Sequence, residues 1–577
     1  MYPIFTTIRI QDYPFSCQNP QNLNKPFSFS FSLTGTVNRK LIRATTMKGQ
    51  RRESMEEEKE EERKSERQRR ERAERAERRD VLRARPCGCG GSSSLSSSTD
   101  DYKDIISSLP DCLLIHIFSF LPTRASVATS ILSSRWRSLW KLVPVLDLDQ
   151  RLLFTRLDTD YPGPTRTNSN FSFLDAVSNI WALRNAIPLS KLRLHWTSNC
   201  DSFLVDTWVQ DTLLRGGLQE LDLYISTGPN PPLEMPTTLF FCSTLVSLIL
   251  TGAILLNPPA SASASTFPSL RILVIGGVQY AKHNSISTLL AACPVLQDLS
   301  LIVSTSNFSG LGECAGKVNV IVLIPTLKTL YVQWSADDCW LYKLQINTPA
   351  LEWFRFVGGL GEDVVLENLP NLVEAVIELE DDDLNSVDYA KRVLDFSRPL
   401  LNVQSLKLSI EDAEIFCNPY EDGIPMFHNL SSLMFYGELH PDWFAWDVVL
   451  LMLCQAPKLQ ILAFKLTLED QSYRSDFKRH YHLKEEFYVP ECLSSHLTTF
   501  YYKGFSGHGI EMELVRYVLK EAKVLKTMKI TIESNLGSKA KHRIHKKLMN
   551  FRRSSRTCQI EFDEGHLDLY PHAVLVL

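Results

Sequence analysis

The 577-residue sequence lacks any apolar run long enough to span a bilayer. Its most apolar stretch, LVSLILTGAILL at 245–256, is too short and contains a glycine. The first residues, MYPIFTTIRIQDYPFSC, lack a basic start followed by an apolar core, so no secretory signal is expected. These absences predict a soluble protein of the cytoplasm, the nucleus or both, with no membrane partner.

The sequence also lacks a strong excess of charge of either sign. Its formal net charge is -4, so no global field favours nucleic acid, and a nucleic-acid partner is not expected. Of its 13 cysteines only Cys87 and Cys89 lie close together, and no second pair has zinc-finger spacing. Free thiols in a reducing compartment are therefore expected, without a metal or another cofactor.

Signals for catalysis are weak as well. SGLGECAGKV around Gly316 and Lys317 has a misplaced first glycine for a phosphate-binding loop, and Val318 stands where a magnesium-binding hydroxyl is required. GFSGHG brings Ser506 near His508 but lacks the spacing of a nucleophile elbow. The acidic run ELEDDDLNSVD at 378–388 is interpreted as a solvated loop. We therefore predict a protein without catalytic residues.

The first hundred residues differ from the rest. Residues 1–46 are rich in Ser, Phe, Asn and Thr, and the run that follows Met47 is almost entirely Glu and Arg. Without an apolar stripe that run cannot form a core helix, although charge pairs could hold it as an exposed one. We expect a disordered or charged helical extension over 1–100, with a nuclear import signal or a weak nucleic-acid contact as the alternative. Mass spectrometry of the native N-terminus tests whether 1–46 belong to the protein.

Three short helices are expected next. LPDCLLIHIFSFLP places Leu113, Ile117 and Leu121 at helical spacing, while Leu114 and Phe118 widen the apolar face before a proline ends the helix. The second helix is expected in TRASVATSILSS, with Thr123 as cap and Val127 and Ile131 on one side. The third is expected in SRWRSLWKLV, with Ser133 or Ser134 as cap and Trp136, Leu139 and Trp140 together on one side. So small a unit has surplus apolar residues, which we expect a partner or the next domain to cover.

This ordered set resembles an F-box, especially the plant type that precedes leucine-rich repeats, with Cys112 where an acidic residue is usual. The resemblance implies that residues 104–148 bind a Skp-type adaptor and so dock on a cullin-based ubiquitin ligase. The residues it implicates are Leu109, Pro110, Leu113, Ile117, Phe118, Leu121, Pro122, Val127, Ile131, Leu132, Arg135, Trp136, Leu139 and Trp140. Leu139 and one tryptophan are expected at the junction with the next domain, with the choice of tryptophan left open. The alternative is a three-helix packing unit without a partner.

A short apolar pattern then recurs at intervals of mostly low twenties to about thirty residues. Its copies are LSKLRL at 189, LQELDL at 218, LVSLIL at 245, LRILVI at 270, LQDLSL at 296, LKTLYV at 327, LEWFRF at 351, LVEAVI at 372, VQSLKL at 403, LSSLMF at 430, LQILAF at 459, LTTFYY at 497 and LKTMKI at 525. This is the period of leucine-rich repeats, and VLDLD at 145–149 is expected to be the strand that precedes them. An irregular solenoid is predicted over 149–485.

Alternation along each strand points the apolar residues of the pattern inward and the intervening residue to the concave face. Those intervening residues are Arg193, Asp222, Ile249, Val274, Ser300, Tyr331, Arg355, Val376, Lys407, Met434, Ala463, Tyr501 and Lys529. Concave solenoid faces bind partners, so Tyr331, Arg355 and Lys407 are candidate target contacts. The alternative is that they are ordinary solvated strand residues.

The C-terminal segment resembles the FBD domain that follows repeats in many plant F-box proteins, and it is expected over 486–563 with a tail at 564–577. The matching residues are Val489, Pro490, Cys492, Leu493, Leu497, Phe500, Gly504, Gly507, Glu511, Glu513, Tyr517, Leu519, Ala522, Leu525 and Met528, while Phe487 stands where a tryptophan is common. The pattern is strand, helix, strand: a last repeat that closes the sheet edge. KAKHRIHKKLMNFRRSSR is predicted to be a basic helix with Ile544, Leu548 and Phe551 on one face, and it is interpreted as a solvated capping helix rather than a nucleic-acid patch.

The sequence thus predicts an α/β chain: a three-helix F-box, an irregular leucine-rich-repeat solenoid and an FBD cap. The function it implies is target recognition for a cullin-based ubiquitin ligase of the SCF type. One alternative is a repeat scaffold or receptor that does not engage the ligase, and another is a solenoid with a small-molecule pocket. The target, any ligand and the oligomeric state are not encoded in a recognisable pattern.

Overall fold

The computed structural model describes residues 106, 108–154, 173–184, 187–198, 200–228, 231–259, 267–303, 318–334, 342–361, 363–367, 369–379, 387–409, 426–439, 446–468 and 489–562. The chain divides into the units Met1–Ser107 and Ser108–Leu577, and the elements below belong to the second. The expected N-terminal extension, the tail and most of the run at 378–388 lie outside the described residues.

The unit that opens at Pro110 is helical but less regular than expected. It contains α2 (Asp111–Phe118), α3 (Thr123–Ala128) and α4 (Trp136–Leu139), with 3-10 turns at Thr129–Ile131 and Trp140–Leu142. The three expected helices are therefore present, although the third is α-helical for only one turn before it continues as a 3-10 turn. Pro122, not Thr123, is the N-cap of α3, since the Thr123 hydroxyl instead accepts a hydrogen bond from the N–H of Asp147.

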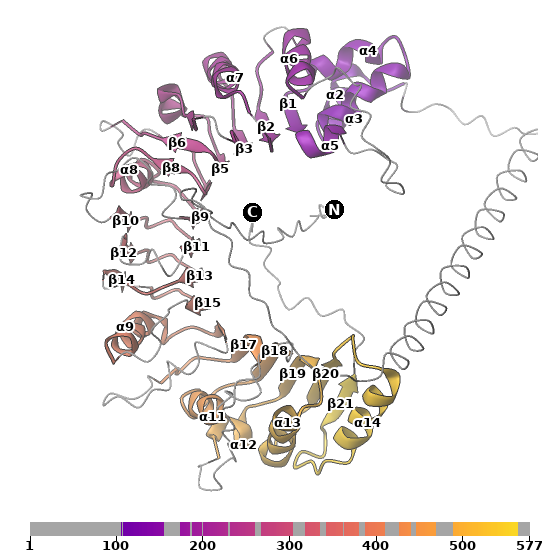
Figure 1. Ribbon diagram of the computed structural model, residues 1–577, viewed down its shortest axis with the longest axis vertical. Coiled ribbons are helices and arrows are strands. Elements are labelled where there is room, and N and C mark those ends of the chain that lie inside the picture. Colours follow the sequence, from indigo (N-terminus) through magenta and orange to yellow (C-terminus); the bar gives the residue numbers. More distant parts are fainter. Residues whose placement is uncertain are drawn as a thin grey trace, which may run out of the picture. The chain divides into compact units, whose positions relative to one another are not determined.

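The repeats form one parallel sheet of fifteen strands among the described residues (Figure 1). The strands, in spatial order, are β1 (Val145–Asp149), β2 (Lys191–Trp196), β3 (Glu220–Ile225), β5 (Ser247–Gly252), β7 (Ile272–Gly276), β9 (Asp298–Ile302), β11 (Thr329–Gln333), β13 (Trp353–Gly358), β15 (Glu374–Leu379), β16 (Ser405–Ser409), β17 (Ser432–Leu439), β18 (Ile461–Leu468), β19 (Thr499–Phe505), β20 (Thr527–Ile532) and β21 (Gln559–Phe562). Every copy of the repeated pattern is one of these strands, as predicted. Two strands lie outside the thirteen copies: β1, which the sequence placed at 145–149, and β21.

The strand register brings the intervening residues into a single line, which we call the row. It joins the thirteen predicted residues from Arg193 to Lys529, and it is extended by Asp147 on β1 and Glu561 on β21. The residues on either side of it, such as Leu192 and Leu194, are buried in the core. The inward apolar positions are therefore buried as predicted, but so are seven residues of the row: Val274, Ser300, Tyr331, Val376, Lys407, Met434 and Ala463.

One face of the sheet is covered by helices and by two small sheets (Figure 1). The α-helices described after β1 are α5 (Gln150–Phe154), α6 (Phe173–Leu183), α7 (Ser202–Arg215), α8 (Ser285–Ala291), α9 (Val387–Ser397), α11 (Trp446–Cys454), α12 (Glu491–Ser495), α13 (Gly509–Glu521) and α14 (Ser538–Met549). The small sheets are β4 (Leu233–Glu234), β6 (Ile254–Leu256) and β8 (Gln279–Tyr280), and β10 (Val318–Val322), β12 (Tyr342–Asn347) and β14 (Val364–Glu367). Val318 is buried at the start of β10, whereas a phosphate-binding loop leads into a helix.

The C-terminal repeat is built around one buried carboxylate. Glu511 on α13 is 1% exposed. It accepts hydrogen bonds from the Tyr502 hydroxyl at 2.9 Å, the Ser506 hydroxyl at 2.6 Å and the His508 N–H at 2.9 Å. Ser506 and His508 thus cap a helix. Gly504 has φ +87, and a Cβ there would overlap the carbonyl oxygen of Leu466.

The basic helix α14 forms as predicted, but it is followed by a further strand, β21, that the sequence did not predict. Ile544 and Leu548 are buried, and Phe551 packs against the same core. β21 pairs with β20 and is the outermost strand of the sheet among the described residues.

Candidate functional site

An apolar surface is exposed on the helices before the sheet. Leu113 and Ile117 on α2 are 47% and 43% exposed, while Leu114 and Phe118 on its other side are buried. Further exposed apolar side chains are those of Phe120, Ile131 and Leu132, at 75%, 85% and 71%. Full burial of one such side chain contributes about 1.5–3 kcal/mol. This surface therefore has the chemistry of an interface.

The fourteen residues implicated by the sequence separate by burial. The exposed ones are Pro110, Leu113, Ile117, Pro122, Ile131, Leu132 and Arg135; the half-buried ones are Leu109, Leu121, Val127 and Trp136; the buried ones are Phe118, Leu139 and Trp140. The buried three support the surface from below and offer a partner little area. The sequence analysis missed Phe120, because within an apolar run the sequence alone does not show whether a residue at the end of a helix faces the core or the solvent.

A small core beneath this surface joins it to the sheet. Leu114, Phe118, Leu139 and Val143 are its buried members, and Trp136 and Val145, the first residue of β1, pack against it. The Trp136 ring meets that of Phe118 edge to face at 5.4 Å. Trp136 therefore lies with Leu139 in the core that joins the helices to β1.

Arg135 ties the two ends of the helical unit together. Its Nε and Nη2 donate to Oδ1 of Asp111 at 2.8 Å and 2.5 Å, and Nη2 also donates to the Leu109 carbonyl. Both side chains remain partly exposed, at 39% and 58%. The pair fixes the start of α2 beside the start of α4, so that the exposed apolar residues keep one arrangement.

Direct hydrogen bonds anchor the helical unit to the first strands. The Thr123 hydroxyl accepts from the Asp147 N–H at 2.8 Å, and Arg124 donates to the Leu152 carbonyl. Buried Arg184, the residue after α6, donates to the Val143 carbonyl, and burial and the neighbouring Arg215 lower the pKa of Arg184 to about 10. The apolar surface is thus held in a fixed relation to the sheet.

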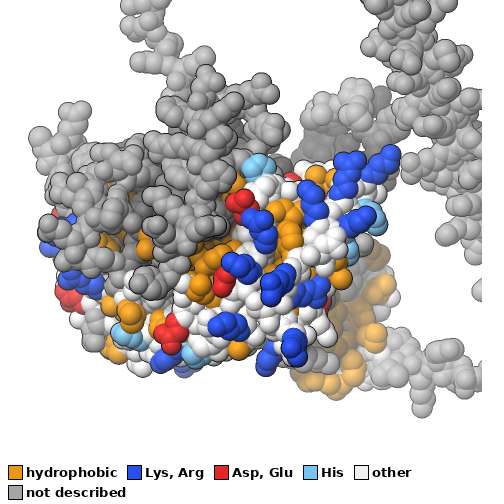
Figure 2. Space-filling model, turned by 90° about the horizontal axis from the view of Figure 1, so that it is seen from below, with side chains coloured by type: hydrophobic (Ala, Val, Ile, Leu, Met, Phe, Trp, Pro, Cys, Tyr) orange, Lys and Arg blue, Asp and Glu red, His pale blue; other side chains and the backbone are white. Residues whose placement is uncertain are grey.

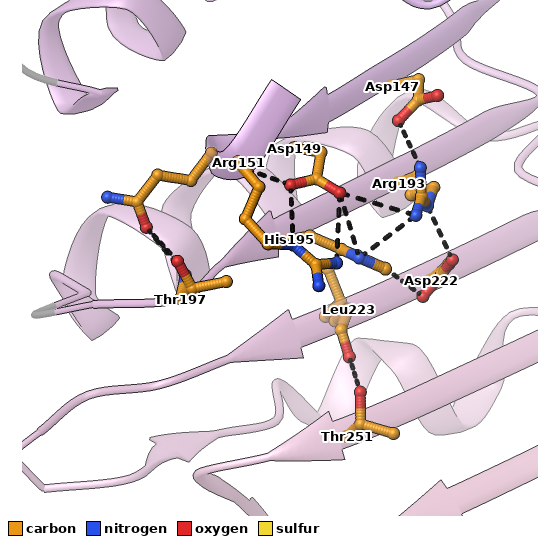
Figure 3. A network of polar contacts seen from close by, with 10 residues as sticks. Asp147, Asp149, Arg151, Arg193, His195, Thr197, Asp222, Leu223 and Thr251 are labelled. Atoms are coloured by element: carbon orange, nitrogen blue, oxygen red, sulfur yellow. Dashed lines mark hydrogen bonds and ion pairs between the residues drawn. The ribbon is translucent and has the colours of Figure 1, made fainter. Parts of the chain in front are cut away.

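A charged network occupies the row at β1, β2 and β3 (Figure 3). Arg193 donates to Asp147 at 3.1 Å and to Asp222 at 3.2 Å, and His195 Nε2 lies 2.9 Å from Asp222 Oδ1. Asp149 is 5% exposed. Its burial would raise its pKa, but hydrogen bonds and charge from Arg151, together with His195, outweigh burial and lower that pKa. The sequence placed Arg193 and Asp222 in the row but did not show that they pair.

The three candidate target contacts also lie in the row, and each has an intramolecular partner. The Arg355 guanidinium lies 5.2 Å from the centre of the Tyr331 ring and 2.6 Å from Glu378. Lys407 lies 2.6 Å from Glu374 of β15. Lys407 is on β16, so β15 separates its strand from that of Arg355. Tyr331 and Lys407 are only 4% and 7% exposed. Arg355, whose side chain is 26% exposed, is the most accessible of the three.

The described ranges contain no group of three or more His, Cys, Asp or Glu residues arranged to hold a metal ion. Within the same ranges, no helix is both long and apolar enough to cross a membrane.

A long parallel sheet of repeated strands, opened by a helical unit and closed by a strand-helix-strand repeat, defines a leucine-rich-repeat protein. Three family models match this chain: the F-box domain over 106–148, the repeats of the FBD-associated F-box protein At5g56370 over 205–324, and FBD over 485–530. The chain belongs to the F-box/FBD/LRR-repeat family.

Two relatives illustrate the match. The chain is 32% identical to the F-box/FBD/LRR-repeat protein At4g00160 of Arabidopsis thaliana over 469 residues, which cover 80% of this chain and 94% of the relative. It is 33% identical to the F-box/FBD/LRR-repeat protein At3g52680 of the same plant over 481 residues, which cover 81% of this chain and 95% of that relative. The similarity thus extends over nearly the full length of each relative. Members of F-box families are typically non-catalytic adaptors.

Proposed function

We propose that this protein is the target-recognition subunit of a cullin-based ubiquitin ligase of the SCF type. In this proposal the F-box binds a Skp-type adaptor, the face of the sheet that carries the row binds a target protein, and other subunits supply the thioester chemistry. The protein would act in the cytoplasm, the nucleus or both.

The observation that carries the proposal is the exposed apolar surface of the F-box. Ile131 and Leu132 are more than two-thirds exposed, although the small core beneath them is complete. Leaving such residues in water is unfavourable, whereas a partner helix that covers them recovers their burial energy. An adaptor is the partner that the family match indicates.

The contribution of the chain to ubiquitin transfer would be proximity. Anchoring the F-box to β1 keeps the target face at a set position relative to the adaptor, which raises the effective concentration of target lysines near the conjugating enzyme. Arg355 is the residue of the row that we propose as a direct target contact, since its side chain is part-exposed and the surrounding Glu378 and Tyr331 orient it.

Co-purification of the full chain with a Skp-type adaptor tests the proposal. A one-to-one complex on size exclusion is expected, and the double substitution Ile131→Ala with Leu132→Ala is expected to abolish it. The matched control is Phe203→Ala with Leu214→Ala on α7, because both of these residues are 76% exposed and lie outside the F-box. If the folded wild-type chain forms no complex, the alternative of a repeat scaffold without ligase engagement replaces the proposal.

A further inference from the structure

A segment shortly before the C-terminus, between Glu533 and Glu561, has a charge very different from that of the whole chain. Residues 534–560 contain eight Lys or Arg and no Asp or Glu, in a protein whose net charge is -4. Six of these side chains are exposed: Lys539, Arg543, Lys546, Lys547, Arg552 and Arg556. We call this set the basic face. Figure 2 shows Lys and Arg side chains gathered at this end of the molecule.

The basic face is built from one helix and the turn that follows it. Four of its residues lie on α14, and the other two lie in the turn that follows. The backbone N–H of Ser554 in that turn donates to the Leu519 carbonyl at 2.9 Å, which places the turn beside the exposed Lys520 and Lys523 at the end of α13. Among the described residues, none of the six forms an ion pair.

Folding accounts for only part of this charge. Ile544 and Leu548 already attach α14 to the core, and the basic face lies on the opposite, solvent side. The helix dipole favours Lys546 and Lys547 in the last turn, but it disfavours Lys539 and Lys541 in the first. Lys546 and Lys547 also lie within one helical turn of Arg543, so that like charges repel.

The surroundings of the basic face indicate what kind of anion it suits. Stacking on single-stranded nucleic acid requires exposed aromatic rings, and the large apolar side chains exposed within 489–562 are only Val489 and Met549. A membrane-surface helix requires a free apolar side, but the apolar side of α14 is buried in the core. Reading a duplex requires an element that enters a groove, whereas α14 lies against the core between β20 and β21.

We propose that the basic face docks an acidic segment of the target protein. This inference rests on the proposed function, and it names a class of target: proteins with a run of Asp or Glu. The twelve residues of α14 extend over about 18 Å, a length that roughly six residues of extended polypeptide cover. Its Lys and Arg side chains would pair with the carboxylates of such a run.

Fluorescence anisotropy of the full chain with a labelled peptide of eight glutamates tests the inference. A peptide of eight glutamines and an oligonucleotide of eight thymidines, each with the same label, are the comparison probes. The glutamate peptide is expected to bind at least about tenfold more tightly than either, with an affinity that falls as salt is added. Tighter binding of the oligonucleotide would overturn the inference in favour of nucleic acid.

The variant Arg543→Gln, Lys546→Gln, Lys547→Gln is expected to weaken binding of the glutamate peptide about tenfold. The matched control Arg271→Gln, Lys343→Gln, Lys458→Gln removes the same charge from exposed positions elsewhere, and it is expected to change the affinity less than about twofold. Equal losses in both variants, or no binding to the wild-type chain because its own acidic segments occupy the face, would contradict the inference. Adaptor binding is measured separately through the F-box, so failure of the proposed function is distinguishable from failure of this docking.

Discussion

The hydroxyl of Thr123 in α3 accepts a hydrogen bond from the backbone N–H of Asp147 in β1 at 2.8 Å. Thr123 is 5% exposed, so the bond is shielded from water. It connects the helical unit that we propose binds the adaptor to the first strand of the sheet that we propose binds the target. Loss of this bond should therefore weaken the attachment of the two parts.

Thr123→Val keeps the shape of the side chain but removes the acceptor. We expect the free energy of unfolding to fall by about 1–2 kcal/mol, because the Asp147 N–H loses its partner in a shielded position. Urea unfolding followed by circular dichroism measures the change. Thr207→Val is the control, since the exposed Thr207 hydroxyl only donates to the carbonyl of Phe203 in its own helix. Equal effects of the two substitutions would argue against the role of the Thr123 bond.

Glu511→Gln should destabilise the C-terminal repeat. The carboxylate accepts from Tyr502, Ser506 and His508, and an amide NH2 in place of one oxygen would face donors instead of accepting from them. A loss of about 2–3 kcal/mol is expected for a buried charged acceptor. Thermal unfolding tests it against Glu513→Gln, whose carboxylate is 39% exposed and lies 3.9 Å from Arg516. A Tm equal to that of the control variant would refute the structural role of Glu511.

The charged network at β1 to β3 predicts a dependence on pH. Since the folded-state pKa of Asp149 is lowered from 3.8, its ionised form stabilises the fold above that value, and the contribution is lost as pH falls through the folded pKa. Asp149→Asn should therefore lower the urea midpoint near neutral pH, and its difference from wild type should shrink in acid. Asp395→Asn, at an exposed helix position, should show no such convergence. A difference for Asp149→Asn that is independent of pH would contradict the assignment.

Arg355→Lys should weaken the middle of the sheet. A lysine keeps the charge but not the planar guanidinium that stacks on Tyr331 while it pairs with Glu378. We expect a loss of about 1 kcal/mol in the free energy of unfolding. Lys328→Ala removes the exposed ion pair with Glu352 and should cost less than about 0.5 kcal/mol. Unfolding curves that show the larger loss for Lys328→Ala would invert this expectation.

Much of the sheet could be predicted because its pattern repeats. Each copy buries the same alternating positions, such as Leu192 and Leu194 on β2, so both the strand and its outward residue follow from period two. The small sheets were not predicted. β4 and β8 have two residues each, and such short strands form only because neighbouring repeats bring their partners into place.

The sequence could predict which residues belong to each candidate site, but not which of them are exposed or paired. In α2, Leu113 and Leu114 are adjacent leucines, yet one is exposed and the other is buried, because the direction of the core depends on how α2 packs against the later helices. Likewise Tyr331 and Arg355 were placed in the row, but the stacking and ion pairing that shield them depend on Glu378 from the next strand. Residue type and spacing do not encode those distances.

Because the strands pair in order at the row, position along the sheet can be counted in strands. Fifteen strands give fourteen spacings, and at about 4.8 Å each the path along the sheet from β1 to β21 is roughly 67 Å. Because every strand contributes one residue to the row, moving a target contact to the neighbouring strand displaces it by a single spacing along this path. The strand on which a target contact lies therefore sets how far along the sheet the target is held from the F-box, and gain or loss of a whole repeat would change that reach in steps of fixed size.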